Sequence, residues 1–461
     1  MNLHEPGSIL LISCYELGHQ PLAAASPLGF LERAGFAADV LDISVDPFDD
    51  FKVERARFVG ISVPMHTALR LGMRVAQRVR EINPDAVVCF YGLYAALNSD
   101  YLLENGADFC IGGECEIPMV ALVEALQIAR MLHHPIDGVI QRGVTAQPYL
   151  QRLRFALPLR DSLPPLEKYA RLEYRQEKRV VGYVEASRGC LHLCTHCPIP
   201  PVYGGRFFVI PEKIVLDDIR AQVQAGARHI TFGDPDFLNG PGHALSVVRG
   251  MNALFPDLTF DITTKVEHIL RRGSILPELG RLGCIFLVSA VESVSNNVLE
   301  ILEKNHTKAD IESAVKVVRT AGIAPRPTWV AFTPWTTRGD YLDMLDFIEN
   351  NQLVDNVDPV QYTIRLLVPP GSYLLNRPEM KEHLGPLNQA AFSYTWAHPD
   401  PGMDRLQKEV SALVEKDVHA GTDPAVTFHR VWALASGRKP CAISLAPDRQ
   451  RAPRLSEPWF C

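Results

Sequence analysis

Residues 184–198 read VEASRGCLHLCTHCP and hold three cysteines, Cys190, Cys194 and Cys197, in the spacing C-x3-C-x2-C. Cysteine thiolates are the usual ligands of iron–sulfur clusters, and three of them this close together can hold three irons of one [4Fe–4S] cluster. The fourth iron then has no protein ligand and can bind another molecule. We therefore predict an enzyme built around these cysteines.

Two other chemistries compete for the same cysteines. A structural zinc site takes four nitrogen or sulfur ligands, and His192 and His196 could complete such a set. A disulfide framework is disfavoured, because ten cysteines in 461 residues fall far below the density of a stapled secreted domain. The cluster therefore stays the leading interpretation.

Composition narrows the class of protein and its partners. Hydrophobic residues make up 47% and charged residues 21% of the chain, as in ordinary globular proteins. The net charge of −7 gives no general attraction to nucleic acid. The first residues lack the pattern of a secretory signal peptide, and no stretch has the length of a membrane span. We expect a cytoplasmic protein that binds neither nucleic acid nor membrane.

Residues 1–130 predict a doubly wound, Rossmann-like α/β domain. Short apolar segments alternate with amphipathic helical segments, the pattern of a parallel sheet covered on both faces. Ligands bind such sheets beyond the carboxyl ends of the strands. The candidate residues at these ends are His66, Gly92, Gly112, Gly113 and Glu114. The predicted strands cover residues 8–13, 38–43, 58–63, 86–91 and 108–111.

The cysteine motif resembles that of the radical S-adenosylmethionine (SAM) superfamily, and the strand-then-loop entry through residues 184–189 is similar as well. The resemblance implies that SAM chelates the open iron and is cleaved by an electron from the cluster. A reductase or flavodoxin-type partner would supply that electron. The family carries an aromatic residue before the third cysteine, where this chain has His196.

Residues 181–375 alternate strands and helices in six βα units, which fits the partial (β/α)6 barrel that the resemblance implies. Chemistry in β/α barrels sits at the carboxyl ends of strands. By resemblance, the segment with Gly233, Asp234 and Asp236 would bind the SAM amino group. Thr264 and Lys265 would reach SAM or substrate, and Ser289 and Glu292 would contact the ribose. The predicted strands cover residues 182–186, 229–232, 259–263, 284–288, 326–332 and 361–367.

The first domain, joined to this second half, resembles the cobalamin-binding domain of B12-dependent radical SAM enzymes. The similar segments are 59–63, 91–95 and 112–114, while the D-x-H-x-x-G signature of classical cobalamin proteins is missing. The resemblance implies bound cobalamin, with His66 either facing the corrin or buried in the core. The alternative is a Rossmann-like domain that is structural or binds another ligand.

The remaining segments are a connector and a tail. Residues 131–180 are rich in proline and arginine and predict an extended linker. Residues 376–461 predict a largely helical extension that ends in Glu457-Pro-Trp-Phe-Cys461. That ending resembles the radical SAM group named for a Cys-Sec-Ala-Glu-Pro or Cys-Cys-Ala-Glu-Pro tail. It raises the hypothesis that a selenocysteine codon follows Cys461; a frayed terminal residue is the alternative.

The leading functional hypothesis is cobalamin-dependent methyl transfer to a small molecule or peptide. Transfer of the 3-amino-3-carboxypropyl group of SAM to a thiol-bound arsenic species is the first alternative. A radical rearrangement without methyl transfer is the second. A non-catalytic carrier of cluster or corrin is the least favoured.

Overall fold

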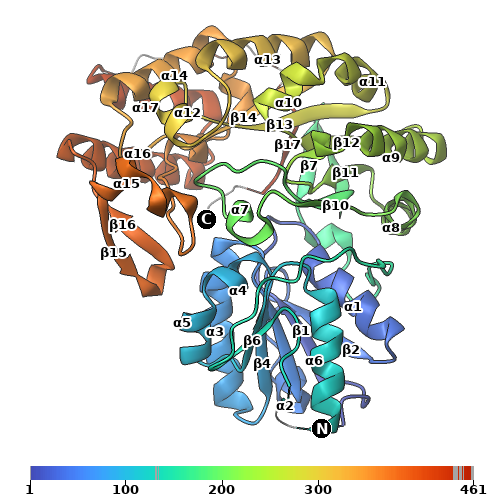
Figure 1. The fold of residues 1–461 in the computed structure, drawn as a ribbon. Coiled ribbons are helices and arrows are strands. Elements are labelled where there is room, and N and C mark those ends of the chain that lie inside the picture. The colour runs from blue at the N-terminus through green and yellow to red at the C-terminus, as the bar shows by residue number, and fades with distance from the viewer. Residues whose placement is uncertain are drawn as a thin grey trace.

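The computed structural model describes residues 2–129, 132, 134–439, 445, 449 and 451–457. Its first sheet is built from the short apolar segments near the N-terminus (Figure 1). The strand order is β2-β1-β3-β4-β5-β6, parallel throughout except for antiparallel β6. The strands are β1 Ile9–Ser13, β2 Ala38–Asp42, β3 Phe58–Ser62, β4 Val87–Tyr91, β5 Phe109–Ile111 and β6 Val139–Gln141.

Helices cover both faces of this sheet, which explains why its strands are apolar on both sides. Ile9 and Leu11 of β1 pack toward α1 and α6, whereas Leu10 and Ile12 pack toward α3. The fold is therefore the predicted Rossmann-like type. The helices are α1 Leu22–Arg33, α2 Asp50–Arg55, α3 His66–Ile82, α4 Leu93–Leu97, α5 Ser99–Glu104 and α6 Glu116–Ile128.

The second sheet curls into a partial barrel above the first domain in Figure 1. Its order is β14-β13-β12-β11-β8-β7-β17, parallel from β8 to β14, with antiparallel β7 and β17 added at one edge. The curl brings the two edges of the sheet together. Arg326 Nη1 on β14 donates to the Pro453 carbonyl oxygen beside β17 at 3.1 Å. The strands are β7 Arg171–Tyr174, β8 Glu177–Val184, β11 His229–Phe232, β12 Thr259–Thr263, β13 Cys284–Glu292, β14 Ala324–Trp329 and β17 Arg454–Leu455.

Helices pack on the outer face of the curled sheet, and a short hairpin with a helix carries the cysteine motif. The hairpin strands are β9 Ser187–Gly189 and β10 Phe207–Val209, with α7 Ile199–Tyr203 between them. The outer helices are α8 Glu212–Gln224, α9 Pro241–Leu254, α10 Val266–Arg271, α11 Leu276–Arg281, α12 Asn296–Ile301, α13 Lys308–Thr320 and α14 Arg338–Asn350.

The prediction of a sixth parallel strand over residues 361–367 is wrong. Residues Pro359–Tyr362 form a 3-10 turn, and a single bridge joins Phe332 to Arg365. The Gln361 side chain accepts the Trp329 backbone N–H at 2.8 Å, so a side chain takes the place of a strand carbonyl there. The predicted extended linker over residues 131–180 likewise contains β6 and β7.

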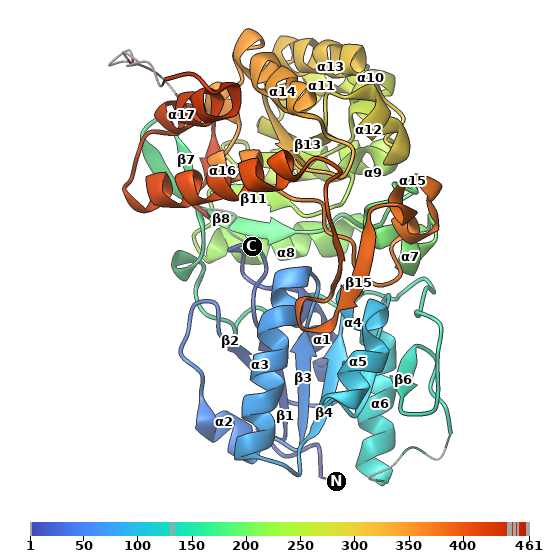
Figure 2. The same cartoon turned by 90° about the vertical axis from the view of Figure 1, so that its left-hand side faces the viewer.

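The C-terminal region combines the predicted helices with a hairpin that the sequence analysis missed. Helices α16 Pro401–His419 and α17 Pro424–Ser436 join the core of the barrel. Strands β15 Leu384–Asn388 and β16 Ser393–Trp396 extend toward the first domain, beside α4 and α5 in Figure 2. Within the described residues, no helix is both long and apolar enough to cross a bilayer.

Candidate active site

The cysteine motif lies in a loop between β9 and α7 that backbone contacts hold in place. Gly189 has φ +73°, and a Cβ there would lie 2.4 Å from the Arg206 carbonyl oxygen, so only glycine fits. The Cys190 N–H donates to that same oxygen at 3.1 Å. The Thr195 N–H donates to the Leu302 carbonyl oxygen at 3.2 Å, which ties the loop to the end of α12. These contacts fix the loop before any cofactor binds.

The chemistry of the three thiols fits a bound cluster. Cys190 and Cys194 are buried and Cys197 is partly exposed. Burial raises the pKa of Cys197 to about 12 and also raises the pKa of Cys190. A thiolate at neutral pH therefore needs a cation, and iron would supply that positive charge. The three cysteines of the motif can supply three sulfur ligands. A four-iron cluster held in this way keeps one iron without a protein ligand.

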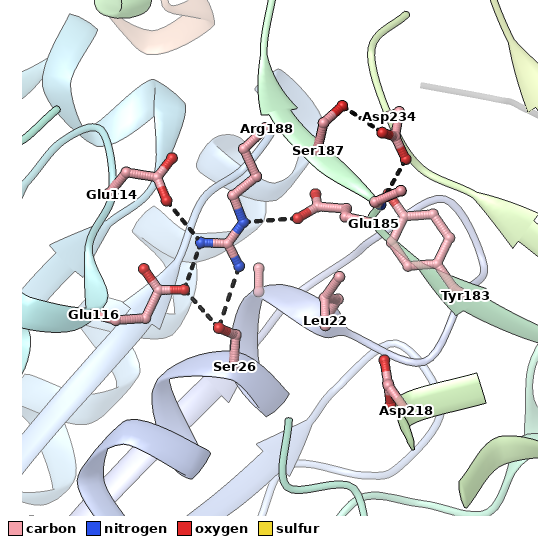
Figure 3. A network of polar contacts seen from close by, with 12 residues as sticks. Leu22, Ser26, Glu114, Glu116, Tyr183, Glu185, Ser187, Arg188, Asp218 and Asp234 are labelled. Carbon is pink, nitrogen blue, oxygen red and sulfur yellow. Dashed lines mark hydrogen bonds and ion pairs between the residues drawn. The ribbon is translucent and has the colours of Figure 1, made fainter. Parts of the chain in front are cut away.

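Asp234 is a buried structural carboxyl next to the motif. It accepts hydrogen bonds from the Ala186 N–H, at 2.9 Å, and from the Ser187 hydroxyl (Figure 3). Burial raises the pKa of Asp234 to about 7, and the two hydrogen bonds offset only part of that rise. Both carboxylate oxygens are thus engaged with the strand that leads into Cys190.

Asp236 lies among polar groups from two other loops. Its Oδ1 accepts from the Thr264 hydroxyl at 2.5 Å, and its Oδ2 lies 3.2 Å from His192 Nε2 and 2.9 Å from His268 Nδ1. Burial alone would raise the pKa of Asp236, but the two rings hold it well below its ordinary value. Lys265 Nζ lies 3.6 Å from Glu267 Oε2 at the edge of this cluster.

Glu292 forms a second buried polar cluster at the end of β13. Its Oε1 lies 3.2 Å from Lys304 Nζ and 3.2 Å from His196 Nε2. Burial opposes ionisation, yet Lys304 and His196 hold the pKa of Glu292 at about 2. Glu292 has φ +70° at a register shift between β13 and β14, which turns its side chain toward the cysteine loop. The Ser289 hydroxyl on the same strand is buried without a hydrogen-bond partner, and it faces α10 and α13 on the outer side of the sheet, away from the barrel cavity.

The candidate residues of the first domain lie at its carboxyl edge, but protein contacts already occupy several of them. His66 begins α3, and its Nε2 lies 2.7 Å from the Ala391 carbonyl oxygen at the tip of the β15–β16 hairpin. Added Cβ atoms would lie 3.2 Å from Val63 at Gly92, 2.4 Å from Ala96 at Gly112 and 2.5 Å from Tyr149 at Gly113. A side chain at any of these three glycines would therefore crowd neighbouring residues of the same chain.

Glu114 belongs to a buried ion-pair network that joins the two halves of the molecule. Arg188, two residues before Cys190, lies 3.1 Å from Glu114, 2.6 Å from Glu116 and 2.8 Å from Glu185 (Figure 3). Burial raises the pKa of Glu114 to about 7, while Arg188 lowers that of Glu116. The sequence analysis missed Arg188, because nothing in its spacing indicates partners 74 and 72 residues away.

A cavity of about 130 Å³ lies inside the barrel, on the inner face of its strands. Alternate strand residues with polar side chains face it, among them Thr231, Asp261 and Arg326. His19 of the first domain and Leu455 of β17 complete its wall. Gly233, a candidate from the sequence, also lines this cavity, whereas Thr231, Asp261 and Arg326 were not candidates because a polar inner face shows no distinct motif.

The structure thus brings together Cys190, Asp236, Thr264, Lys265 and Glu292 around the cysteine loop. Asn239 Nδ2 lies 3.7 Å from Cys190 Sγ, and Lys304 lies near enough to Cys197 to lower its pKa. His66 is held apart from this group by the hairpin contact. Glu114 connects to it only through Arg188.

Two segments of the chain match known family models. Residues 184–348 match the radical SAM superfamily and residues 9–123 match the B12 binding domain. A putative methylthiotransferase of Methanocaldococcus jannaschii is 24% identical over 189 residues, which cover 38% of this chain. The match spans 40% of that relative's own length.

Solved structures extend the similarity over both domains. OxsB, a cobalamin-dependent SAM radical enzyme with aqua-cobalamin bound, matches with a TM-score of 0.68 and 14% identity over 90% of this chain and 67% of its own. TsrM of Kitasatospora setae, a radical SAM methyltransferase with cobalamin and a [4Fe–4S] cluster bound, matches with a TM-score of 0.67 and 16% identity. That match covers 91% of this chain and 89% of TsrM. At these identities the likeness establishes the fold.

The chain therefore joins a B12-binding domain to a radical SAM domain. The radical SAM domain marks the chain as an enzyme, and the two domains imply a [4Fe–4S] cluster, SAM and cobalamin as cofactors.

Proposed function

We propose that this enzyme is a cobalamin-dependent methyltransferase that acts on a small molecule or a peptide. The observation that carries the proposal is the Arg188 network, because it connects the carboxyl edge of the B12-binding domain directly to the cysteine loop. The residues that would hold the cluster and those that would hold the corrin therefore lie on elements that this network joins. The similarity to TsrM, which is named a methyltransferase, supports the same reaction.

Each cofactor has candidate partners among the residues described above. Cys190, Cys194 and Cys197 would hold the cluster, and the edge with His66, Gly92, Gly112, Gly113 and Glu114 would support the corrin. When bound, the cluster and SAM supply reductive cleavage of SAM, and cobalamin supplies methyl transfer. The protein's part is to orient these groups and to exclude water.

The polar residues around the cysteine loop would position SAM. Glu292 is held ionised by Lys304 and His196, so its carboxylate suits the ribose hydroxyls. Ser289 lies with Leu287 and Val291 against α10 and α13, so it is left out of this assignment. Since both oxygens of Asp234 are engaged, backbone carbonyls of the segment from Gly233 to Asp236 are left for the SAM ammonium group.

The substrate would enter beside the barrel cavity, whose wall mixes Asp261 and Arg326 with apolar side chains. Such a lining suits a molecule with polar groups.

We further propose a cytoplasmic enzyme that receives electrons from a flavodoxin-type reductase. We also assign the chain to the group with a Cys-Sec or Cys-Cys tail; residues 458–461 of that ending lie outside the described residues. Sequencing the gene past the Cys461 codon tests this assignment, and a UAA or UAG codon there would exclude selenocysteine.

The test of the function is anaerobic turnover of the reconstituted enzyme with SAM, cobalamin and a chemical reductant. We expect deoxyadenosine and S-adenosylhomocysteine by mass spectrometry. Methylthioadenosine would instead support aminocarboxypropyl transfer. Replacing Cys190, Cys194 or Cys197 by alanine should abolish SAM cleavage, whereas Cys284→Ala, a buried cysteine on β13, should retain it. Cleavage that survives in the motif variants would refute the proposal.

A further inference from the structure

Three side chains beside the cysteine loop converge on one point. His192 Nε2, His268 Nδ1 and a carboxylate oxygen of Asp236 all lie within 4.8 Å of one another. They come from the cysteine loop, from α10 and from the loop after β11, so three separate elements aim them together. The carboxylate side chain is fully buried, and the two histidine side chains are 11% and 12% exposed.

The contacts of the two rings with Asp236 are short, but they lack the alignment of a well-formed hydrogen bond. Neither His192 Nε2 nor His268 Nδ1 has a hydrogen-bond partner, although both are buried and both lie within 3.2 Å of the same Asp236 oxygen. N–H···O bonds weaken steeply as they depart from linearity, and neither ring nitrogen has a hydrogen-bond partner of acceptable geometry. A buried nitrogen without a partner is costly, so the geometry indicates a species placed between the three atoms.

We propose that His192, Asp236 and His268 bind a divalent transition-metal ion of the Zn²⁺ type, separate from the iron–sulfur cluster. Two imidazoles and one carboxylate are a common ligand set for such ions, and three protein ligands leave a coordination position open. That position would accept a nitrogen or oxygen donor of a small molecule. Asp236 would then serve the ion, and the SAM ammonium group would depend on backbone carbonyls.

The surroundings of the three ligands match a second layer of a metal site. Thr264 donates to the oxygen of Asp236 that faces away from the rings, which fixes the carboxylate plane. His192 Nδ1 lies 3.8 Å from Glu267 Oε2, beyond hydrogen-bond distance, so this carboxylate adds negative charge near the ring without fixing its orientation. Lys265 Nζ lies 3.6 Å from the same Glu267 oxygen and balances its charge.

The test counts metal in the full-length chain. Enzyme with a reconstituted cluster is incubated anaerobically with Zn²⁺, passed over a chelating resin and analysed by plasma mass spectrometry. We expect about one zinc ion per chain beyond the irons of the cluster. His268→Ala and, independently, Asp236→Asn should each reduce the retained zinc more than about tenfold. His243→Ala, which removes a histidine bound to the Ala186 carbonyl oxygen, should leave it unchanged.

A cluster-free variant separates this site from the cysteines. With Cys190, Cys194 and Cys197 all replaced by alanine, the chain should still take up zinc, and Co²⁺ in its place should give the visible bands of a tetrahedral or five-coordinate ion. Circular dichroism confirms that each variant is folded. Zinc lost with the cysteines, or retained by folded His268→Ala and Asp236→Asn variants, would overturn the proposal. Because the count needs no turnover, its result is independent of the proposed methyl transfer.

Discussion

The structure gives Asp234 a different role from the one that the sequence predicted. Its place after a barrel strand indicated a contact with SAM. The structure instead gives both its oxygens to the strand before Cys190, at full burial. A buried carboxyl that accepts such hydrogen bonds fixes the position of the backbone that donates them. Asp234 therefore holds the segment that leads into the cysteine loop.

The pH dependence of stability should report this carboxyl. The pKa of Asp234 rises from 3.8 to about 7 on folding, so between these pH values the native state holds a proton that the unfolded chain has lost. Its contribution therefore falls as pH rises through that window, by roughly 4 kcal/mol in total. Asp234→Asn cannot titrate. Urea unfolding at pH 5 and pH 8 should show wild type losing stability relative to Asp234→Asn, and parallel pH profiles would contradict the assignment.

The first sheet was predictable at the residue level and the inner face of the barrel was not. Strand segments such as 58–63 are apolar throughout, so burial on both faces fixes them. Helix ends also follow local signals, as with the capping box of Thr307 and Asp310 at the start of α13. The contact of Glu292 with the SAM ribose stays a prediction, and its pairing with Lys304 depends on a backbone turn with φ +70°. Spacing in the chain contains no such information.

At the scale of elements, short and charged strands were missed. A run of charged residues surrounds the turn between β7 and β8, where Arg175 and Gln176 both have positive φ. Strand β17 pairs through only two residues. Such edges form because the curled sheet offers a free strand, which is a tertiary effect. The junction between β9 and the start of α6 is another such case. There Arg188 faces Glu114 and Glu116, and acidic side chains are favoured at a helix N-terminus.

Replacing Arg188 should weaken this junction strongly. Arg188→Met would leave Glu114 and Glu116 buried without a cation, and breaking a buried pair in this way costs about 3 to 5 kcal/mol. Chemical unfolding monitored by circular dichroism measures the loss. Arg206→Met, which removes an exposed arginine from the same hairpin, should have little effect. An Arg188→Met protein as stable as wild type would show that the network does not hold the two halves together.

At the scale of the molecule, the C-terminal hairpin joins the two domains. Phe392 at its tip is 3% exposed and packs against Tyr101 of α5, with ring centroids 5.2 Å apart, inside the core of the first domain. The sequence gives no sign of this contact, because the hairpin lies far along the chain. The orientation of the B12-binding domain over the barrel thus depends on residues outside both matched family segments.

Phe392→Ala should destabilise the first domain, although Phe392 lies far from that domain in the sequence. Removing a buried phenylalanine costs about 3 to 5 kcal/mol when the site cannot collapse. We expect faster hydrogen exchange of the α5 amides, residues 99–104, than in wild type. Phe51→Ala provides the comparison, because that phenylalanine is 63% exposed on α2. Unchanged exchange in α5 would mean that the hairpin does not stabilise the domain.

The same hairpin sets an order of events during synthesis. The last strand of the first sheet ends at Gln141, but the core of that domain is complete only with Phe392, which the ribosome adds 251 residues later. At about 5 to 20 residues per second, the nascent domain waits roughly 12 to 50 s for this side chain. During that interval the apolar site beside Tyr101 is exposed to solvent, and chaperones that bind exposed hydrophobic surface would find it there.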